Sequence, residues 1–411
     1  MTSIEKKLIQ IVGDSLYPSE KSTIKEEGLS KDEIVKLFVE AQKQSVFPIV
    51  FDKLKERLKI VLEDDLFNEY QIQDSKHRAA TIRNINDHIV LHGILSKRRI
   101  PYVILKGQVS ASYYHKLELR SCGDVDFLIK KADVSRVDRI LVKEGFRKRE
   151  DAEKHDFHWA YTKEKTVLEL HWNIPGVPKN DKKISAIMST VFADAVTYEN
   201  QIGCFRGPSK LHHGMILLLH TLSHLTSTGI GLRHLCDWLV FEESLTDEEF
   251  LSLFEKKLCE VGLWKFAQVL TQIGTLYFGC KEHSWCKEIE PALCSGILED
   301  ILSGGNFGVK SNTRQLEAKI MRNSRTRKIK KGSTFKNLII NINEKAKRKV
   351  PISKKIIILR PIGWIGVVIE YGVWVHKRKL KHLDLKIFKE AERRADLYSE
   401  LHLFEKTKFI D

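Results

Sequence analysis

Residues 119–131 read LRSCGDVDFLIKK and place Asp124 and Asp126 one residue apart in a strand-like segment. Side chains alternate along a β-strand, so the two aspartates share one face while the apolar Val125 and Phe127 share the other. Two carboxylates this close disfavour each other's ionisation unless a cation lies between them, and a divalent metal ion is such a cation. Acidic residues are also common on solvent-facing edge strands. The neighbouring segments therefore decide between a metal site and a surface strand.

A third acidic residue occupies a similar position in a second strand-like segment. In TVLELHWNI, residues 166–174, alternation places Glu169 and His171 on one face and the apolar Leu168 and Leu170 on the other. Three carboxylates on neighbouring strands would form a cluster of hard oxygen ligands, which suits one or two Mg²⁺ ions that also bind substrate phosphates. Glu169 considered alone would be an ordinary acid on a strand surface.

The hydrophobic pattern changes its period around these strands. Helical spacing precedes them and returns from about residue 209, while short apolar strands alternate with helices in between. The predicted helices cover 30–72, 77–98, 108–116 and 132–146, and the predicted strands cover 101–107, 124–129, 155–164 and 166–174. The helix over 132–146 ends at Gly145, where a C-terminal glycine is expected. The pattern predicts an α+β fold, with a small mixed β-sheet embedded between helical N-terminal and C-terminal regions.

Length and composition agree with a folded protein of several units. With 411 residues and 42% hydrophobic residues, the chain is long enough to bury a sizeable core. We expect a helical N-terminal region, a sheet domain, a helical domain that closes a cleft, and a basic and apolar C-terminal region. Their predicted bounds are 1–98, 99–208, 209–309 and 310–411.

Cysteine usage and the N-terminal sequence indicate the compartment. Seven cysteines without a Cys-x-x-Cys pair argue against a zinc ribbon and against a disulfide framework, which favours a reducing environment. The first 21 residues are amphipathic, contain acids and lack the uninterrupted apolar core of a signal peptide. We therefore expect a cytoplasmic protein.

The segments in this order resemble the nucleotidyltransferase superfamily with the polymerase-beta-like fold, and within it an uncharacterised bacterial group often met near surface-polysaccharide genes. The resemblance runs from Arg78 to Asp237 and rests on LKG, R…GDVDFLI, LELHW and GLRHLCDW together. It implies transfer of a nucleotidyl group from a nucleoside triphosphate (NTP) to an acceptor, with two Mg²⁺ ions, or Mn²⁺, held by three carboxylates. The implied catalytic and metal ligands are Asp124, Asp126 and Glu169, the last at a position where many superfamily members have Asp.

The turn before the acidic strand departs from the superfamily pattern. Most members have Gly-Ser there to hold the triphosphate, whereas this chain has Lys106 and Gly107, as in the polysaccharide-linked group. Glycine permits close approach of the backbone, and lysine supplies a compact positive charge. We assign nucleotide binding to Lys106, Gly107, Ser110, Arg120 and His171, with Ser110 as a substitute hydroxyl. Basic residues at strand and helix ends are also commonly solvated, which is the alternative for Lys106 and Arg120.

A histidine-rich helix follows the sheet domain. HHGMILLLHTLSHL places His213, Leu217, His220 and His224 on one stripe, because steps of four, three and four keep to one helical face. His220 and His224 have the spacing of a metal-binding pair, but no glutamate follows the first histidine as in the metalloprotease signature. We favour a helix that lines the cleft over a zinc site.

The next helix, in GLRHLCDW, carries Arg233 and Asp237 four residues apart. This spacing allows a simple ion pair on the helix surface. The resembled group carries the same two residues, which favours a role in bracing the cleft.

The positive charge is concentrated near the C-terminus. The net charge is +15, and residues 310–355 hold 16 Lys and Arg against two Glu. The run KKIIILRPIGWIGVVIEYGVWVHKRK follows at 354–379, with Arg360, Pro361 and Glu370 interrupting its apolar residues. We expect this run to lie at an anionic membrane surface or to pack into the core, with membrane spanning least favoured. A nucleic-acid grip is a weaker alternative, because it would more naturally pair the charge with polar and stacking residues than with the aliphatic residues of this run.

The leading hypothesis is a Mg²⁺-dependent nucleotidyltransferase that modifies a sugar, lipid-linked or protein acceptor at the cytoplasmic face of a membrane, in surface-polysaccharide biosynthesis. A toxin-like enzyme that adds nucleotides to tRNA is a close alternative. A non-catalytic, membrane-associated scaffold with the same fold belongs to a different class. The sequence names neither the NTP nor the acceptor.

Overall fold

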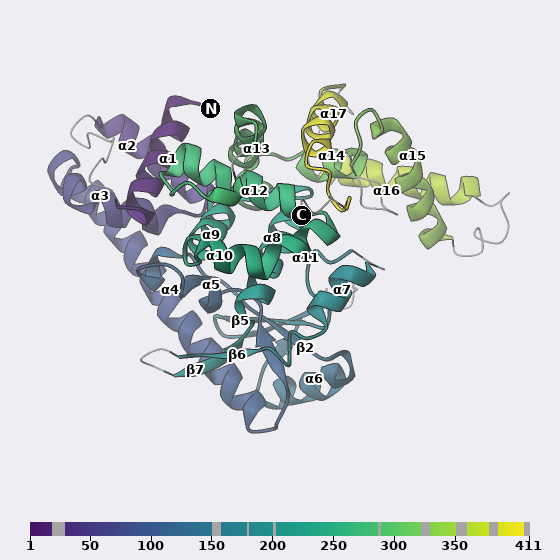
Figure 1. Cartoon of the computed structure of the whole chain (residues 1–411), viewed down its shortest axis with the longest axis horizontal. Coiled ribbons are helices and arrows are strands. Elements are labelled where there is room, and N and C mark those ends of the chain that lie inside the picture. Colours follow the sequence, from purple (N-terminus) through teal and green to yellow (C-terminus); the bar gives the residue numbers. More distant parts are fainter. Residues whose placement is uncertain are drawn as a thin grey trace.

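The computed structural model describes nine segments, which contain most of the predicted strands and helices; residues 155–157 of a predicted strand, and 354–359 and 378–379 of the apolar run, lie outside them. The nine segments are residues 1–18, 29–149, 158–178, 181–199, 203–286, 289–321, 329–350, 360–377 and 385–406. Helices surround a five-stranded sheet and a separate two-stranded sheet, which confirms the predicted α+β fold. In Figure 1 the sheet lies beneath a layer of helices, and the long helix α4 (Asp64–Ser96) runs beside both.

The main sheet has the strand order β1-β2-β5-β4-β3. Its strands are β1 (Tyr102–Ile104), β2 (Val125–Ile129), β3 (Arg147–Lys148), β4 (His158–Lys163) and β5 (Thr166–His171). β2 and β5 pair in parallel and the other neighbours pair antiparallel, so the sheet is mixed as predicted. The register places Asp126 opposite Glu169. Residues in register on neighbouring strands point to the same face, so the two carboxylates lie side by side.

The opposite face of the same strands forms a hydrophobic core. Val125, Phe127 and Leu170 are buried there together with Val137 and Leu141 of α6 (Val134–Lys143). This helix ends before Gly145, whose φ of +87° confirms the predicted terminating glycine. Packing on one side therefore fixes the orientation of the acidic side chains on the other.

The N-terminal helices are α1 (Ser3–Leu16), α2 (Lys31–Lys43) and α3 (Phe47–Val61), followed by α4. Ser30 caps the N-terminus of α2, where its side chain accepts a hydrogen bond from the backbone N–H of Glu33. Residues 30–72 are largely helical, as predicted, but they are divided among three helices: α2 ends at Lys43, and Pro48 lies in the first turn of α3. α4 instead continues without a break through residues 73–76.

Two short elements differ from the prediction. The expected helix over 108–116 is reduced to α5 (Gln108–Ala111), and a single turn follows at Leu117–Leu119. A hairpin of β6 (Val196–Glu199) and β7 (Cys204–Gly207) was not predicted. β6 is largely exposed, so it lacks the alternation of polar and apolar residues that marks a half-buried strand.

The second helical region begins with α7 (Lys182–Met188), α8 (Lys210–Leu225) and α9 (Leu232–Glu243). It continues with α10 (Asp247–Phe250), α11 (Lys256–Val261), α12 (Trp264–Ile273) and α13 (Pro291–Gly304). One hydrophobic core joins these helices to α1, α2 and α3. The division of the chain into four regions stays a proposal, since two of them share this core.

The C-terminal helices are α14 (Arg314–Met321), α15 (Thr334–Lys349), α16 (Arg360–Lys377) and α17 (Leu385–Ser399). Buried Asp300 on α13 anchors α14 and α17, because it accepts hydrogen bonds from Arg314, Arg394 and Tyr398. α15 and α16 pack against each other and project from the body in Figure 1. In the part of the chain that the structure describes, no helix combines the length and the apolarity needed to cross a membrane.

Candidate active site

One large cavity brings the predicted site residues together. Its volume is about 1370 Å³, above the usual range of about 300–1,000 Å³ for small-molecule sites. Eleven of the twelve predicted site residues line it: Lys106, Gly107, Arg120, Asp124, Asp126, Glu169, His171, His220, His224, Arg233 and Asp237. Ser110 does not line it, because its side chain is buried within α5. The proposed hydroxyl contact of Ser110 therefore stays a prediction without structural support.

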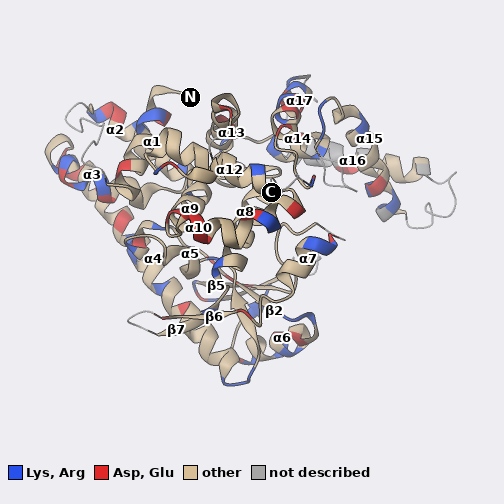
Figure 2. Cartoon of the chain, viewed as in Figure 1, with Lys and Arg blue, Asp and Glu red and all other residues tan. Residues whose placement is uncertain are grey.

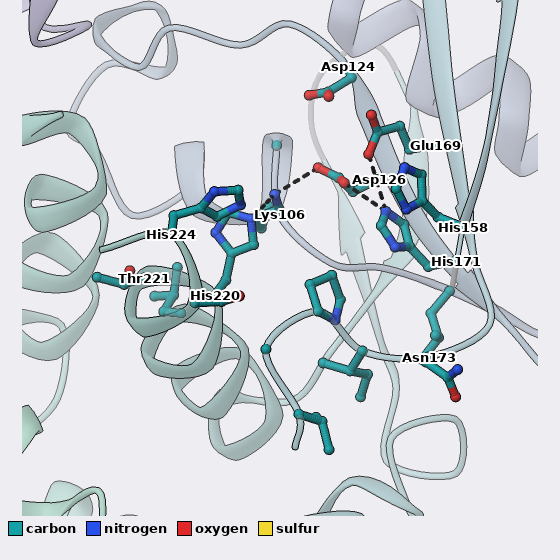
Figure 3. Close-up of a pocket in the computed structure, with 18 of the residues that line it drawn as sticks. Lys106, Asp124, Asp126, His158, Glu169, His171, Asn173, His220, Thr221 and His224 are labelled. Atoms are coloured by element: carbon teal, nitrogen blue, oxygen red, sulfur yellow. Dashed lines mark hydrogen bonds and ion pairs between the residues drawn. The ribbon is translucent and has the colours of Figure 1, made fainter. Parts of the chain in front are cut away.

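The acidic face lies on one side of the cavity. Figure 3 shows Asp124, Asp126 and Glu169 grouped opposite His220 and His224 of α8. Asp124 comes immediately before β2, whereas Asp126 and Glu169 lie within their strands. The arrangement follows from the sheet register, because parallel β2 and β5 bring the two strand carboxylates to adjacent positions.

The charges of the two aspartates are compensated unequally. Asp126 Oδ2 lies 3.0 Å from Lys106 Nζ, and Asp126 Oδ1 lies 2.9 Å from His171 Nε2. Burial would raise the pKa of Asp126, but Lys106 and His171 hold it well below its usual value. The negative charge of Asp126, together with burial, raises the pKa of Asp124. Asp124 is thus left with unfavourable negative charge that a divalent cation would relieve.

His171 lies between two of the carboxylates. Its Nε2 is 2.9 Å from Asp126 Oδ1 and 3.5 Å from Glu169 Oε2. Burial would lower the pKa of His171, but these two carboxylates raise it. The potential ligand atoms of Asp126, Glu169 and His171 all lie within 4.8 Å of one another, so this group fits a metal ion. The contact of His171 with nucleotide stays a prediction.

The Lys106-Gly107 turn is held in one conformation. Gly107 has φ +64°, and a Cβ there would lie 2.9 Å from His88 Nε2, so both the backbone and the available space require glycine. Lys106 Nζ lies 2.9 Å from His220 Nε2 as well as close to Asp126. The ammonium group therefore joins the sheet side of the cavity to α8.

Polar residues of α4 support this turn and the acidic strand from behind. Asn84 Nδ2 donates to the carbonyl oxygens of Gly123 and Asp124, both at 3.3 Å, and Asn84 Oδ1 accepts from Gln108 Nε2 at 3.0 Å. Sequence reasoning missed Asn84, His88 and Gln108. Asn84 and His88 lie four residues apart on the apolar face of a helix. A polar side chain buried on such a face needs a hydrogen-bond partner, and this was the signal that could have identified both residues.

The α8 histidines fall into two groups. His220 and His224 line the cavity with ring centroids 4.4 Å apart, and His234 of α9 stacks on His220. Burial, followed by the charge of Lys106, holds the pKa of His220 well below its usual value, so its neutral ring accepts a hydrogen bond from Lys106. His213 instead stacks on Tyr113, away from the cavity.

Asp237 pairs with Arg120, not with Arg233. Arg120 Nε and Nη2 donate to the two oxygens of Asp237 at 2.7 and 2.8 Å, and Tyr114 Oη donates to the same carboxylate at 2.9 Å. The predicted alternative of an Arg233–Asp237 surface pair is therefore wrong. Arg233 Nη1 donates instead to the backbone oxygen of Ser121 at 3.0 Å. Both contacts connect α9 to the segment just before Asp124.

Comparison with known proteins assigns the chain to a family. A family model described as an uncharacterised nucleotidyltransferase matches residues 30–279. The chain belongs to this family. The nucleotidyltransferase match contains the whole main sheet, α8, α9 and all twelve predicted site residues. No curated protein matches the chain.

The matched nucleotidyltransferase region ends before α13, so the basic C-terminal helices lie outside it.

Sequence reasoning also missed several residues that line the cavity. They are Trp172, the loop 173–178 and Phe307. In this loop Gly176 has φ +85°, and a Cβ there would lie 2.2 Å from the backbone oxygen of Leu219 on α8. The loop therefore closes one side of the cavity by direct packing on α8.

Proposed function

We propose that this nucleotidyltransferase family member transfers a nucleoside monophosphate from an NTP to a sugar, lipid-linked or protein acceptor. The observation that carries the proposal is the register of β2 and β5, which sets Asp126 beside Glu169 with Asp124 at the start of the strand. Carboxylate oxygens are the ligands that Mg²⁺ prefers, and the raised pKa of Asp124 marks a shortage of nearby positive charge. The side chains present therefore fit a divalent metal site.

Asp124, Asp126 and Glu169 would hold two Mg²⁺ ions, or Mn²⁺. When bound, such ions neutralise the negative charge that develops on phosphate oxygens during an in-line displacement. Lys106 would bind the triphosphate, since it lines the cavity and its ammonium lies between Asp126 and His220. We propose that Arg120 acts through Asp237 to hold the acidic strand, because its Nε and Nη2 are bound to that carboxylate.

We propose further that the C-terminal helices bring the enzyme to an anionic membrane surface on the cytoplasmic side. Ile362, Ile365 and Ile369 are exposed at helical steps of three and four along α16. Figure 2 shows Lys and Arg on α15, which packs against α16, and on α17. Basic residues attract anionic lipid while an exposed apolar face enters the interface. A membrane location favours a lipid-linked acceptor, as surface-polysaccharide synthesis requires.

Acceptor labelling tests this function. Purified protein is incubated with each α-labelled NTP, Mg²⁺ and fractions of a cell extract, and the labelled fraction is identified. We expect label in a glycan, lipid or protein fraction, and none with Asp124→Asn or Asp126→Asn. Label in tRNA would support the toxin-like alternative. The absence of label from every fraction would support the scaffold.

A further inference from the structure

A second cluster of acids and histidine lies outside the cavity, where α9 meets α10 and the segment 280–286. Glu242 and Glu243 end α9, Asp247 begins α10, and His283 belongs to the third segment. Glu242 and His283 are only 1% and 4% exposed. No residue of this cluster lines the cavity that contains Asp124. The cluster is therefore independent of the proposed nucleotidyl transfer.

The ligand atoms of this cluster converge. His283 Nε2 lies 3.0 Å from Glu242 Oε2 and 3.8 Å from Glu243 Oε2. One potential ligand atom from each of the three residues lies within 4.8 Å of the other two. Two consecutive helical residues normally point about 100° apart, yet the carboxylates of Glu242 and Glu243 lie 3.0 and 3.8 Å from the same nitrogen, His283 Nε2.

Asp247 fixes the orientation of the imidazole. Asp247 Oδ1 lies 2.7 Å from His283 Nδ1, and Asp247 Oδ2 accepts hydrogen bonds from the backbone N–H and the hydroxyl of Ser284. Nδ1 therefore faces a carboxylate that is itself held in place, and Nε2 faces Glu242 and Glu243. Metal-binding histidines are typically oriented in this way, with the second ring nitrogen donating to a carboxylate.

The converging atoms are not satisfied by hydrogen bonds. Both oxygens of Glu242, Oε2 of Glu243 and Nε2 of His283 have no hydrogen-bond partner among the residues that the structure describes. The 3.0 Å approach of His283 to Glu242 lacks hydrogen-bond geometry. The nearby Lys281 Nζ lies 3.7 Å from Glu243 Oε1. Buried polar atoms are nearly always satisfied, so four that face one another indicate a missing ligand.

We propose that Glu242, Glu243 and His283 bind a divalent transition-metal ion of the Zn²⁺ class, with Asp247 as a positioning residue. Imidazole nitrogen and carboxylate oxygens are all zinc ligands, and an imidazole that faces two carboxylates suits such an ion. The ion joins the end of α9 to the segment 280–286. Because α9 also carries Asp237, this site stabilises the helix that braces the acidic strand.

The rival arrangement is a protonated His283 that bridges the carboxylates without a metal. Burial would lower the pKa of His283, but Glu242, Glu243 and Asp247 together raise it to about 10 in the metal-free protein. The two arrangements differ in metal content. A metal site also has a fixed stoichiometry of one ion per chain.

Zinc titration of the full-length protein distinguishes them. Asp126→Asn is used as the background, because the active-site group could also bind Zn²⁺. After treatment with EDTA and dialysis, we expect one Zn²⁺ per chain by calorimetry and elemental analysis, and a rise in melting temperature. His283→Gln and Glu243→Gln should each weaken binding at least tenfold, whereas Glu248→Gln, an exposed acid on α10, should leave it unchanged.

Glu243→Gln guards against loss of fold, because this side chain is partly exposed and its replacement keeps the same shape. Circular dichroism confirms that each variant is folded. Zn²⁺ binding below about 0.2 equivalents per chain, with an unchanged melting temperature, would overturn the proposal. Equal Zn²⁺ affinity in the background protein and in folded Glu243→Gln would overturn it as well.

Discussion

The ammonium group of Lys106 contacts both the sheet side and the α8 side of the cavity. This group is shared by Asp126 and His220 in the absence of substrate, and bound phosphate would compete for it. We expect Lys106→Ala to weaken NTP binding by about 1.5–3 kcal/mol, the value of one charge-assisted hydrogen bond. Calorimetry with a non-hydrolysable NTP measures this change. Lys116→Ala is the control, since Lys116 pairs with Asp52 at the surface, and equal effects of both variants would remove Lys106 from the phosphate site.

Asp124 should reduce the stability of the metal-free protein at neutral and alkaline pH. Its pKa is raised in the folded state by the charge of Asp126 and by burial, so the folded protein binds this proton more tightly than the unfolded chain does. The corresponding stabilisation is complete below the unfolded value of about 4 and is lost as pH rises through the folded value. An asparagine side chain at this position would be neutral at every pH.

We therefore expect Asp124→Asn in EDTA to be more stable than the wild type at pH 8, by about 1–2 kcal/mol, with the difference vanishing toward pH 4. Denaturant unfolding at both pH values measures this. Mg²⁺ should stabilise the wild type more than the variant. A variant that is less stable than the wild type at pH 8 would show that Asp124 carries no unfavourable charge.

At the level of elements, the Arg120–Asp237 pair connects the segment before β2 to α9. Both side chains are buried, so removal of one partner leaves an uncompensated charge. Asp237→Asn should lower the free energy of unfolding by about 3–5 kcal/mol. Arg233→Met should cost less than half of this, because Arg233 is partly exposed and makes one hydrogen bond to a backbone oxygen. Thermal and denaturant melts compare the two, and equal losses would contradict the bracing role of the pair.

The strands β2 and β5 could be predicted from the sequence, because acidic and apolar residues alternate along each of them. Only the apolar face of such a strand can pack into a core. Their pairing could not be predicted from local pattern, since Asp126 and Glu169 are brought together by the sheet register. The partner of Asp237 was missed for a similar reason. Helical spacing pointed to Arg233, whereas the true partner, Arg120, lies 117 residues away. Apolar lining residues such as Phe307 carry no chemical signature of a site.

At the level of the whole molecule, the sequence predicted where the positive charge lies but not how its helices attach. Asp300 resembles any helical acid in ILEDILSG, yet it is fully buried among Arg314, Arg394 and Tyr398. A truncation at Val309 would leave this carboxylate without its partners. Substitutions on the exposed face of α16 are therefore a better test of membrane binding.

Ile365→Glu and Ile369→Glu should reduce co-sedimentation with anionic vesicles at least tenfold, because both side chains are about 60% exposed and acids repel the surface. Binding of the wild type should fall as salt rises. Ile60→Glu on α3, which is also exposed, should have no effect. A gel-shift with tRNA is run in parallel. Wild-type binding to tRNA with none to vesicles would contradict the membrane assignment.

We propose that the carboxylates of β2 and β5 direct nucleotidyl transfer, and the fate of two labels on the NTP tests this claim. The wild type, Asp126→Asn and Glu169→Gln are each incubated with Mg²⁺, extract and the same NTP labelled at either the α or the γ phosphate. We predict that the wild type transfers the α label to the acceptor and releases the γ label as pyrophosphate, while both folded variants do neither. Transfer of the γ label, or undiminished α transfer by either variant, would contradict the claim.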